Sequence, residues 1–402
     1  MKTLQINCVY KKGSTGKIIS DHHMLLKQKG SESVVCYGRG KRMREEGVYQ
    51  ICNDFLGKLN HLYSRITGLM YGGCAFSTAR LIRRIEKERP DVVHLHCING
   101  NFVNIYRLIT WLKVHHIPTV LTLHAEFMYT ANCGHSFECE KWMTGCGGCP
   151  QLRSATGSFL FDRTAASWIK MRDAFFGFEE LIVTSVSPWL MQRAQCSPIL
   201  SAFRHTTVLN GVNTAVFHPY DPSDLQAFYP NDGKPIFLHV SANFNSEQSH
   251  CKGGYYLIAL AKMLPDVLFL VAGPHENDMK LPPNVLLLGN ISDQKKLAML
   301  YSLADATVLT SRRETFSMPV AESLCCGTPV VGFQAGAPER IAIPEYSEFV
   351  PYGAVDALAD ACRRVRQKKA AEEIAEKARK KFDRERMTEE YLHIYEILKG
   401  KE

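Results

Sequence analysis

The stretch SRRETFSMPVAESLCCGTPVV, residues 311–331, decides the fold. The run ATVLTS at 306–311 is short, apolar and β-branched, so it predicts a buried strand. Residues 318–326 suit a helix that Gly327 can end, and PVVGF at 329–333 begins a second buried strand. This order makes one βαβ unit, in which the polar loop lies on the ligand-binding edge of a parallel sheet. Backbone N–H groups at the helix start favour an anion such as phosphate there.

The composition is that of an ordinary globular protein with room for two domains. The chain has 402 residues, 46% apolar and 22% charged, and its formal charge of +8 favours anionic ligands or surfaces. The start, MKTLQINCVY, is too short an apolar run for a signal peptide, and no run approaches the roughly 18 apolar residues of a spanning helix. We therefore expect a cytoplasmic protein that touches a membrane at most peripherally, with its 14 cysteines mostly reduced.

Buried strands alternate with helices along both halves of the chain. The predicted strands are 4–9, 33–37, 91–96, 118–124 and 180–185, then 236–240, 267–272, 285–288, 306–310 and 330–333. The segment 210–232, rich in Asn, Pro and Asp, is predicted to be the linker region. The pattern predicts an α/β fold of two doubly wound, Rossmann-like domains facing each other across a cleft. We place them at 1–205 and 206–384, with a C-terminal helix in 385–402 packing back on the first.

Two helices of the first half have distinct faces. Between 57 and 71, apolar residues recur at helical spacing: Leu59, Leu62, Ile66 and Leu69. A second helix is predicted to begin near Ser77 as N-cap and to turn a basic face outward. That face, formed by Arg80, Arg83, Arg84 and Lys87, is either a solvated surface or a contact for an anionic membrane.

Histidines end two of the predicted strands. His96 closes the strand 91–96 and His124 closes the strand 118–124, while His94 lies on the first of them. On parallel strands this places both terminal histidines near the ligand-binding edge. Each is either a structural hydrogen-bonding group or a ligand contact, and His124 is the stronger ligand candidate.

Four cysteines lie close together in one glycine-containing loop, CGHSFECEKWMTGCGGCP. They are Cys133, Cys139, Cys146 and Cys149. Four thiolates so spaced can surround a structural Zn²⁺, with His135 as a substitute ligand. Free buried thiols are the main alternative, and a redox role for the CGGC pair is a weaker one because no thioredoxin-like context precedes it.

Two carboxylates eight positions apart, Glu314 and Glu322, flank the helix start in the deciding stretch. A general acid/base pair, as in glycoside hydrolases, is one interpretation. Beside an anion-favouring helix start, however, carboxylates can accept hydrogen bonds from sugar hydroxyls while backbone N–H groups hold phosphate. Lys252 follows the strand 236–240 on the same predicted edge and can neutralise a diphosphate leaving group. Together these residues predict a nucleotide-diphosphate site.

The deciding stretch resembles the E-x7-E region of the retaining GT-B glycosyltransferases of glycosyltransferase family 4. Lys252-Gly253, NGVN at 210–213, AGP at 272–274 and the terminal helix with Met387, Tyr391 and Tyr395 follow in that family's order. The N-terminal GSTG, VHLH at 93–96 and WMTGCGGCPQ resemble a subgroup used in bacterial exopolysaccharide assembly, the colanic acid WcaC-type transferases.

The resemblance implies a role for each matching position. Glu322 would hold the donor ribose, Glu314 and the backbone near Phe316, Ser317 and Met318 the donor sugar and diphosphate, and Lys252 the diphosphate. His124 would contact the donor sugar near the reacting carbon. Loops that approach the donor or acceptor would contain the remaining positions, which are Gly13, Gly16, Ser241 and Gly273.

Two departures from the family pattern stand out. The family often has an arginine five positions before the lysine, but 243–250 contains no basic residue except His250, so Arg312 or Arg313 would have to compensate. The subgroup often has His-Asp where this chain has His124-Ala125-Glu126, which leaves Glu126 as a substitute for the aspartate.

By resemblance, the chain is expected to move a hexose from a UDP- or GDP-linked sugar to a growing, lipid-linked oligosaccharide with retention and without a catalytic metal. One alternative is a nucleotide-sugar epimerase or hydrolase on the same architecture. Another is a zinc-stabilised, basic nucleic-acid-binding protein, whose binding would fall steeply with added salt. The carboxylates at the anion site disfavour this last class.

Overall fold

The computed structural model describes residues 1–221, 223–226, 229, 233–276 and 278–400. The chain forms two compact units, which we call unit 1 (Met1–Leu209 with Met387–Glu402) and unit 2 (Asn210–Arg386). The second boundary falls inside the last helix, α15 (Arg384–Leu398), so most of that helix belongs to unit 1.

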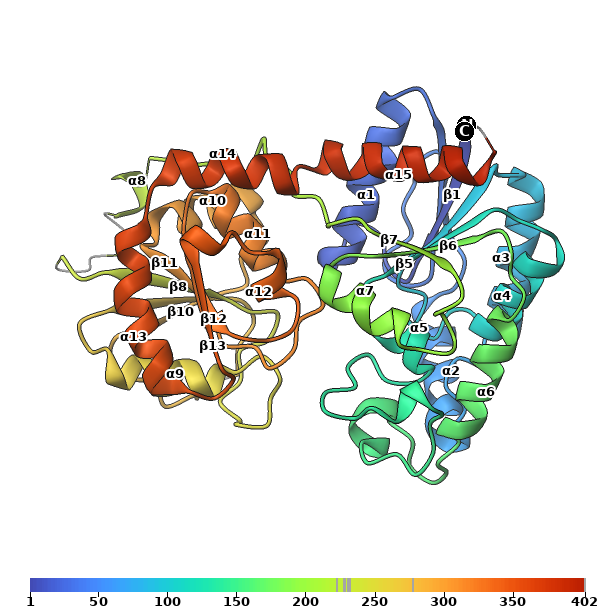
Figure 1. Cartoon of the computed structure of the whole chain (residues 1–402), viewed down its shortest axis with the longest axis horizontal. Coiled ribbons are helices and arrows are strands. Elements are labelled where there is room, and N and C mark those ends of the chain that lie inside the picture. The colour runs from blue at the N-terminus through green and yellow to red at the C-terminus, as the bar shows by residue number, and fades with distance from the viewer. Residues whose placement is uncertain (222, 227–228, 230–232, 277, 401–402) are drawn as a thin grey trace. The chain divides into compact units, whose positions relative to one another are not determined.

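Unit 1 is built on a seven-stranded, wholly parallel sheet in the order β3-β2-β1-β4-β5-β6-β7 (Figure 1). Its strands are β1 (Lys2–Asn7), β2 (Glu32–Tyr37), β3 (Val48–Gln50), β4 (Val92–Leu95), β5 (Thr119–Leu123), β6 (Leu181–Ser185) and β7 (Arg204–Thr207). Strands β4, β5 and β6 are buried along their whole length, because helices cover both faces of the sheet.

Helices flank this sheet, with α1 and α15 on one side and α3, α4 and α6 on the other (Figure 1). Besides α15, the helices of unit 1 are α1 (Gly13–Gln28), α2 (Asp54–Thr67), α3 (Ala75–Glu88), α4 (Ile105–Val114), α5 (Phe127–Thr130), α6 (Thr164–Phe175) and α7 (Pro188–Gln195). On the last helix, Tyr391, Ile394 and Tyr395 are buried, so this face packs inward.

Unit 2 repeats the plan with six parallel strands in the order β10-β9-β8-β11-β12-β13. They are β8 (Ile236–Val240), β9 (Leu268–Ala272), β10 (Val285–Gly289), β11 (Ala306–Leu309), β12 (Val330–Phe333) and β13 (Ser347–Val350). Helices α9 and α13 lie on one face and α10, α11 and α14 on the other (Figure 1). The helices are α8 (Ser223–Gln226), α9 (Gly254–Met263), α10 (Gln294–Leu303), α11 (Met318–Cys325), α12 (Pro338–Ile341), α13 (Val355–Val365) and α14 (Ala371–Phe382).

Each sheet has one point where the strand order reverses, and ligands of doubly wound folds bind beside such points at the carboxyl ends of the strands. In unit 1 the reversal lies between β1 and β4, and in unit 2 between β8 and β11. The loops that follow these four strands therefore decide where a ligand can bind in each unit.

The predicted pair of doubly wound α/β domains is confirmed, and every predicted strand is present with its ends displaced by two residues at most. The sequence missed β3, β7 and β13, which are short strands at sheet edges. Ser77 is not an N-cap, because α3 already begins at Ala75 and the Ser77 hydroxyl donates to the Cys74 carbonyl. The predicted linker lies partly outside the described residues.

No helix in the described part of the chain combines the length and the apolar character needed to span a bilayer.

Candidate active site

An ion pair between Lys252 and Glu314 lies at the reversal point of unit 2, with Nζ and Oε1 2.8 Å apart. Lys252 follows β8 and Glu314 follows β11, the two strands that flank this point. Burial lowers the pKa of Lys252, but the charge of Glu314 and its hydrogen bond outweigh burial, so the pKa lies above its ordinary value. The ammonium is therefore charged at neutral pH. The lysine side chain is 30% exposed, which leaves it within reach of an anionic ligand.

Two glycines let the surrounding loops approach the strand ends. Gly253 has a φ of +69°, and a Cβ there would lie 1.9 Å from the Thr310 carbonyl oxygen just beyond β11. Gly273 follows β9 with a φ of +140°, and its Cβ would lie 1.8 Å from the Ser241 carbonyl oxygen. Any side chain at these positions would push the loops apart, so the close backbone cradle depends on glycine.

The start of α11 is strained at Ser317. This residue has a φ of +83°, a left-handed conformation that is costly for a residue other than glycine. Its buried hydroxyl has no hydrogen-bond partner among the described residues. Phe316 beside it is buried and meets the ring of Phe382 edge-on, while Met318 begins the helix. Backbone strain and a buried hydroxyl without a hydrogen-bond partner are features typical of ligand-binding sites. A bound ligand could supply the hydrogen bond that the Ser317 hydroxyl lacks.

Glu322 lies one turn into α11, half-buried, and its Oε2 accepts a hydrogen bond from the Tyr301 hydroxyl at 3.1 Å. Tyr301 is fully buried on α10, and burial together with the nearby carboxylate raises its pKa well above the ordinary value. The hydroxyl therefore stays protonated and fixes the carboxylate. No sequence pattern pointed to Tyr301, because its partner is 21 residues away on another helix.

Arg312 lies beside the lysine loop, since its backbone N–H donates to the Cys251 carbonyl at 2.8 Å. Arg312 is one of the two arginines that the sequence suggests as compensation for the missing family arginine, and its backbone lies next to the Lys252 loop as that suggestion requires. Ser241, at the end of β8, donates its hydroxyl to the Asn243 carbonyl at 3.0 Å, so this side chain already has a partner.

In unit 1, Gly13 and Gly16 lie in the first turn of α1 and not in a separate turn before it. Gly13 has a φ of +66°, and a Cβ on Gly16 would lie 3.3 Å from the Lys11 backbone nitrogen. This turn follows β1, so it borders the reversal point of unit 1.

The strand-end histidines of unit 1 belong to a buried polar network. His96 Nδ1 lies 3.2 Å from His124 Nε2, and the rings of His96 and His94 lie 3.8 Å apart. Tyr395 on α15 then joins two histidines: its hydroxyl is 2.6 Å from His94 Nδ1 and 2.9 Å from His22 Nε2. Burial lowers the pKa of His124 to about 4 and that of His22 to about 3, so both are neutral at pH 7. Sequence reasoning missed His22 and its contact with Tyr395, because these two residues are 373 positions apart.

Glu126 anchors the cysteine loop. Its Oε2 accepts hydrogen bonds from the Ser136 hydroxyl at 2.5 Å and from Arg193 at 3.4 Å. Burial alone would raise the pKa of Glu126, but the nearby His135 ring, whose Nδ1 lies 3.8 Å from Oε1, the hydrogen bond from Ser136 and the charge of Arg193 lower it to about 2. These contacts give Glu126 a structural role, while its buried Oε1 has no hydrogen-bond partner among the described residues.

The four predicted metal ligands line one small cavity of about 20 Å³. Burial raises the pKa of Cys133 to about 12 and that of Cys146 to about 11, and each of these thiols feels the charge of others in the set. Across the described residues, no group of three or more His, Cys, Asp or Glu side chains is arranged to hold a metal ion. The structure therefore brings the cysteines together but gives the zinc prediction no support.

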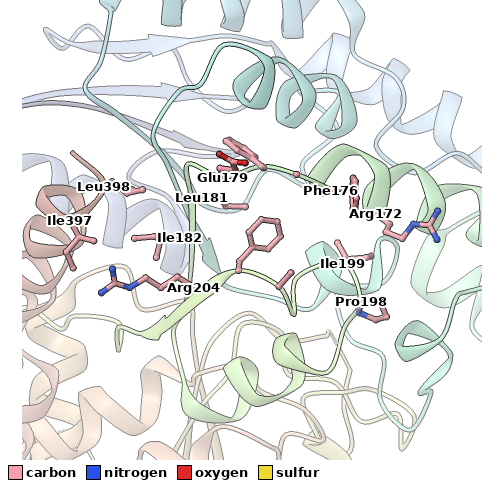
Figure 2. Close-up of a pocket in the computed structure, with 14 residues that line it drawn as sticks. Arg172, Phe176, Glu179, Leu181, Ile182, Pro198, Ile199, Arg204, Ile397 and Leu398 are labelled. Atoms are coloured by element: carbon pink, nitrogen blue, oxygen red, sulfur yellow. The ribbon is translucent and has the colours of Figure 1, made fainter. Parts of the chain in front are cut away.

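A larger cavity, of about 470 Å³, lies in unit 1 at the edge of the sheet opposite to the carboxyl ends of its strands (Figure 2). It opens at the amino ends of β6 and β7, where Ile182 and Arg204 lie near Ile397 and Leu398 of α15. None of the predicted site residues lines this cavity.

Three comparisons place the chain among known proteins. Residues 222–381 match the family described as Glycosyl transferases group 1. Over 99% of this chain and 100% of the relative, the sequence is 23% identical to the putative colanic acid biosynthesis glycosyl transferase WcaC of Escherichia coli K12. The fold is similar to that of sucrose-phosphate synthase from Thermosynechococcus elongatus (TM-score 0.70, 16% identity, 100% of both chains). It is also similar to Anabaena HepE in complex with UDP-glucose (TM-score 0.65, 16% identity, 98% of this chain and 99% of that one). The predicted GT-B fold and the resemblance to group 1 enzymes are confirmed.

Proposed function

We propose that this chain, whose residues 222–381 match the family described as Glycosyl transferases group 1, is a retaining glycosyltransferase that moves a hexose from a nucleotide-diphosphate sugar to an oligosaccharide acceptor. The observation that carries the proposal is the Lys252–Glu314 pair at the reversal point of unit 2, with Glu322 and the strained start of α11 on the same stretch. A cation, two carboxylates and a helix start match the charges and hydroxyls of such a donor.

Relatives support a nucleotide sugar as the donor. Anabaena HepE is seen in complex with UDP-glucose, and the similar structure described as trehalose-6-phosphate from E. coli is bound with UDP-2-fluoro glucose. We assign the ribose to Glu322, the sugar to Glu314 and His124, and the diphosphate to Lys252 and the backbone at 316–318. Gly13, Gly16, Ser241 and Gly273 complete the proposed contacts.

Transfer would proceed by front-face attack. The acceptor hydroxyl oxygen bonds to the anomeric carbon on the face from which the diphosphate leaves, and the leaving phosphate oxygen takes the hydroxyl proton. The chain would need no nucleophile of its own. Its residues position the donor and stabilise the charge that grows on the diphosphate, mainly through Lys252 and the helix start. No catalytic metal enters this scheme.

The acceptor is proposed to be lipid-linked, with the enzyme cytoplasmic and in peripheral contact with the inner face of the membrane. Support comes from the WcaC likeness over the full length of both chains, which points to exopolysaccharide, capsule or O-antigen assembly. It also comes from the excess of basic residues, which gives the formal charge of +8.

A thermal-shift screen of UDP-, GDP- and other nucleotide sugars tests the donor assignment, because tight binding to the folded state raises its stability. We expect one nucleotide class to raise the melting temperature, and Glu322→Ala to reduce the rise at the same ligand concentration. The absence of a shift with every nucleotide sugar would contradict the proposal.

Product analysis separates a transferase from an epimerase or hydrolase of the same fold. A transferase leaves the donor largely intact until an acceptor is added. An epimerase converts free donor to an isomer, and a hydrolase releases free sugar at the same rate with or without acceptor.

The structural zinc stays a prediction. One zinc per purified chain, lost in a Cys146→Ser, Cys149→Ser variant, would establish it. Metal-free protein whose unfolding is indifferent to a chelator would instead leave four free, partly buried thiols around the small cavity.

A further inference from the structure

Helix α2 turns its large apolar side chains away from unit 1. Only Gly57 and Ser64 are buried along this helix. Six apolar residues on the opposite side are exposed: Phe55 (68%), Leu56 (38%), Leu59 (48%), Leu62 (49%), Tyr63 (45%) and Ile66 (46%). Their spacing places them in one stripe, because residues three, four and seven apart share a helix face.

Small and polar groups hold α2 in this orientation. The Asn60 side chain donates to the Asn101 carbonyl at 3.3 Å and accepts from the Cys74 N–H at 3.2 Å. A Cβ on Gly57 would lie 2.6 Å from the Arg39 side chain, so the inner face sits close to its neighbours. Gly68 ends the helix in the left-handed conformation, and the Asn53 side chain caps its start. The apolar stripe therefore contributes little to holding the helix on unit 1.

A second segment extends the stripe. Phe159, Leu160 and Phe161 are 52%, 69% and 49% exposed. Their loop joins the end of α2, because the Phe159 N–H donates to the Arg65 carbonyl at 2.9 Å and a Cβ on Gly68 would lie 2.3 Å from the Phe161 carbonyl oxygen. We call these three residues and the six of α2 the apolar ridge.

Cations border the apolar ridge. The Arg65 guanidinium lies 3.9 Å from the centre of the Phe159 ring, and that of Arg163 lies 5.6 Å from the centre of the Phe161 ring. Lys58 is exposed on α2 itself. The loop 39–46, joined to α2 by a hydrogen bond from the Gly40 N–H to Asp54, holds four basic residues against two acidic ones.

The apolar ridge also lies on the ligand-binding side of its own sheet. Helix α2 follows the carboxyl end of β3, and the loop at 159–161 follows β5 and α5. His96 and His124 stand at the carboxyl ends of β4 and β5, on the same edge of unit 1.

We propose that the apolar ridge inserts into the interfacial layer of an anionic phospholipid membrane. Exposed Phe, Tyr and Leu side chains suit the boundary between head groups and acyl chains, while the bordering Lys and Arg side chains suit anionic head groups. An exposed apolar surface of this kind marks an interaction site. The cations at its border favour an anionic lipid surface over the uncharged surface of a partner protein. The inference deepens the proposed function, since it names the surface that brings a lipid-linked acceptor to the carboxyl edge of unit 1.

The test is co-sedimentation of the full chain, without donor or acceptor, with vesicles of phosphatidylethanolamine that contain roughly a quarter phosphatidylglycerol. We expect Phe55→Ser, Leu59→Ser, Leu62→Ser together to lower vesicle binding by about 30-fold or more. Lys58→Glu, Arg163→Glu should weaken binding to these vesicles but not to vesicles of phosphatidylcholine alone.

A matched control replaces two exposed apolar residues of unit 1 outside the ridge, Val114 (63%) and Phe176 (81%), by Ser. It should bind vesicles like the unaltered chain.

The thermal shift caused by nucleotide sugars should be unchanged in all these variants, so a failed donor assignment and a failed membrane assignment give different results. Absence of vesicle binding by the unaltered chain, or equal binding by the triple variant, would overturn the proposal. So would a dimer in analytical ultracentrifugation that the triple variant converts to monomer, since the ridge would then face a second copy.

Discussion

The Lys252 ammonium and the Glu314 carboxylate lie 2.8 Å apart at the carboxyl ends of the two strands between which the order of the unit 2 sheet reverses. Each neutralises the charge of the other. In the proposed complex, a diphosphate at Lys252 would compete with Glu314 for the ammonium, and the carboxylate would then become available to a sugar hydroxyl. The pair thus links recognition of the two halves of the proposed donor.

Lys252→Ala should lower kcat by about 10²- to 10³-fold, the cost of removing one charge that stabilises a transition state. The KM for the acceptor should stay nearly unchanged, because the proposed role is on the leaving group. Steady-state kinetics at saturating donor measure both quantities. Lys252→Arg, which keeps the charge but changes its shape, should retain part of the rate. Equal losses in kcat and in acceptor affinity would contradict this role.

Glu322→Ala should weaken donor binding by about 10- to 100-fold, the worth of a hydrogen bond to a charged group. Isothermal titration with the donor measures the loss. Tyr301→Phe is the matched control, because it removes the hydroxyl that fixes Glu322 but leaves the carboxylate in place. It should have the smaller effect. Unchanged donor affinity in Glu322→Ala would show that the ribose assignment is wrong.

Tyr395→Phe should lower the free energy of unfolding by about 1–3 kcal/mol, because it leaves one ring nitrogen on each of two buried histidines without its hydrogen-bond partner. Urea unfolding at pH 7.5 measures the change. Tyr63→Phe, at an exposed position on α2, should be neutral. If both variants unfold like the unaltered chain, the network does not bind α15 to unit 1.

Stability should fall as the pH drops below about 6.5, the ordinary pKa of histidine. Burial holds the folded-state pKa of His22 at about 3 and that of His124 at about 4, so the unfolded chain takes up protons that the folded chain refuses. Each such histidine contributes stability that is complete above pH 6.5 and is lost at about 1.4 kcal/mol per pH unit toward its folded pKa. Urea unfolding from pH 7.5 to 5 measures this slope, and a flat profile would show that these histidines are protonated in the folded chain.

Glu126→Gln should destabilise the chain by on the order of 3 kcal/mol at neutral pH. The folded-state pKa of about 2 lies below the ordinary value, so the stabilisation is complete above about pH 4.5 and is lost as the pH falls toward 2. The difference in unfolding free energy between the two chains should therefore narrow in acid. Donor affinity should not change, because Glu126 is engaged by Ser136 and Arg193; a large loss of donor affinity would instead assign it to the ligand.

The sequence alone determined the architecture. Parallel strands buried between two layers of helices must consist of apolar residues. Such apolar runs, together with the glycine and proline signals around 311–331, identified every strand of both sheets except three at the edges. Edge strands such as β7, with the sequence RHTT, are half exposed and lack that signal. The spacing of Glu314 and Glu322 and the position of Lys252 also marked one sheet edge.

The tertiary structure decided which of these side chains meet. Lys252 and Glu314 are 62 residues apart, and His94 and Tyr395 are 301 apart, so no local pattern could pair them. It also decided the direction of α2. Helical spacing shows that Leu59, Leu62 and Ile66 share a face, but only the close packing of Gly57, Asn60 and Ser64 shows that this face is the outer one. Periodicity defines a stripe, and the neighbours of the opposite stripe decide whether it is buried.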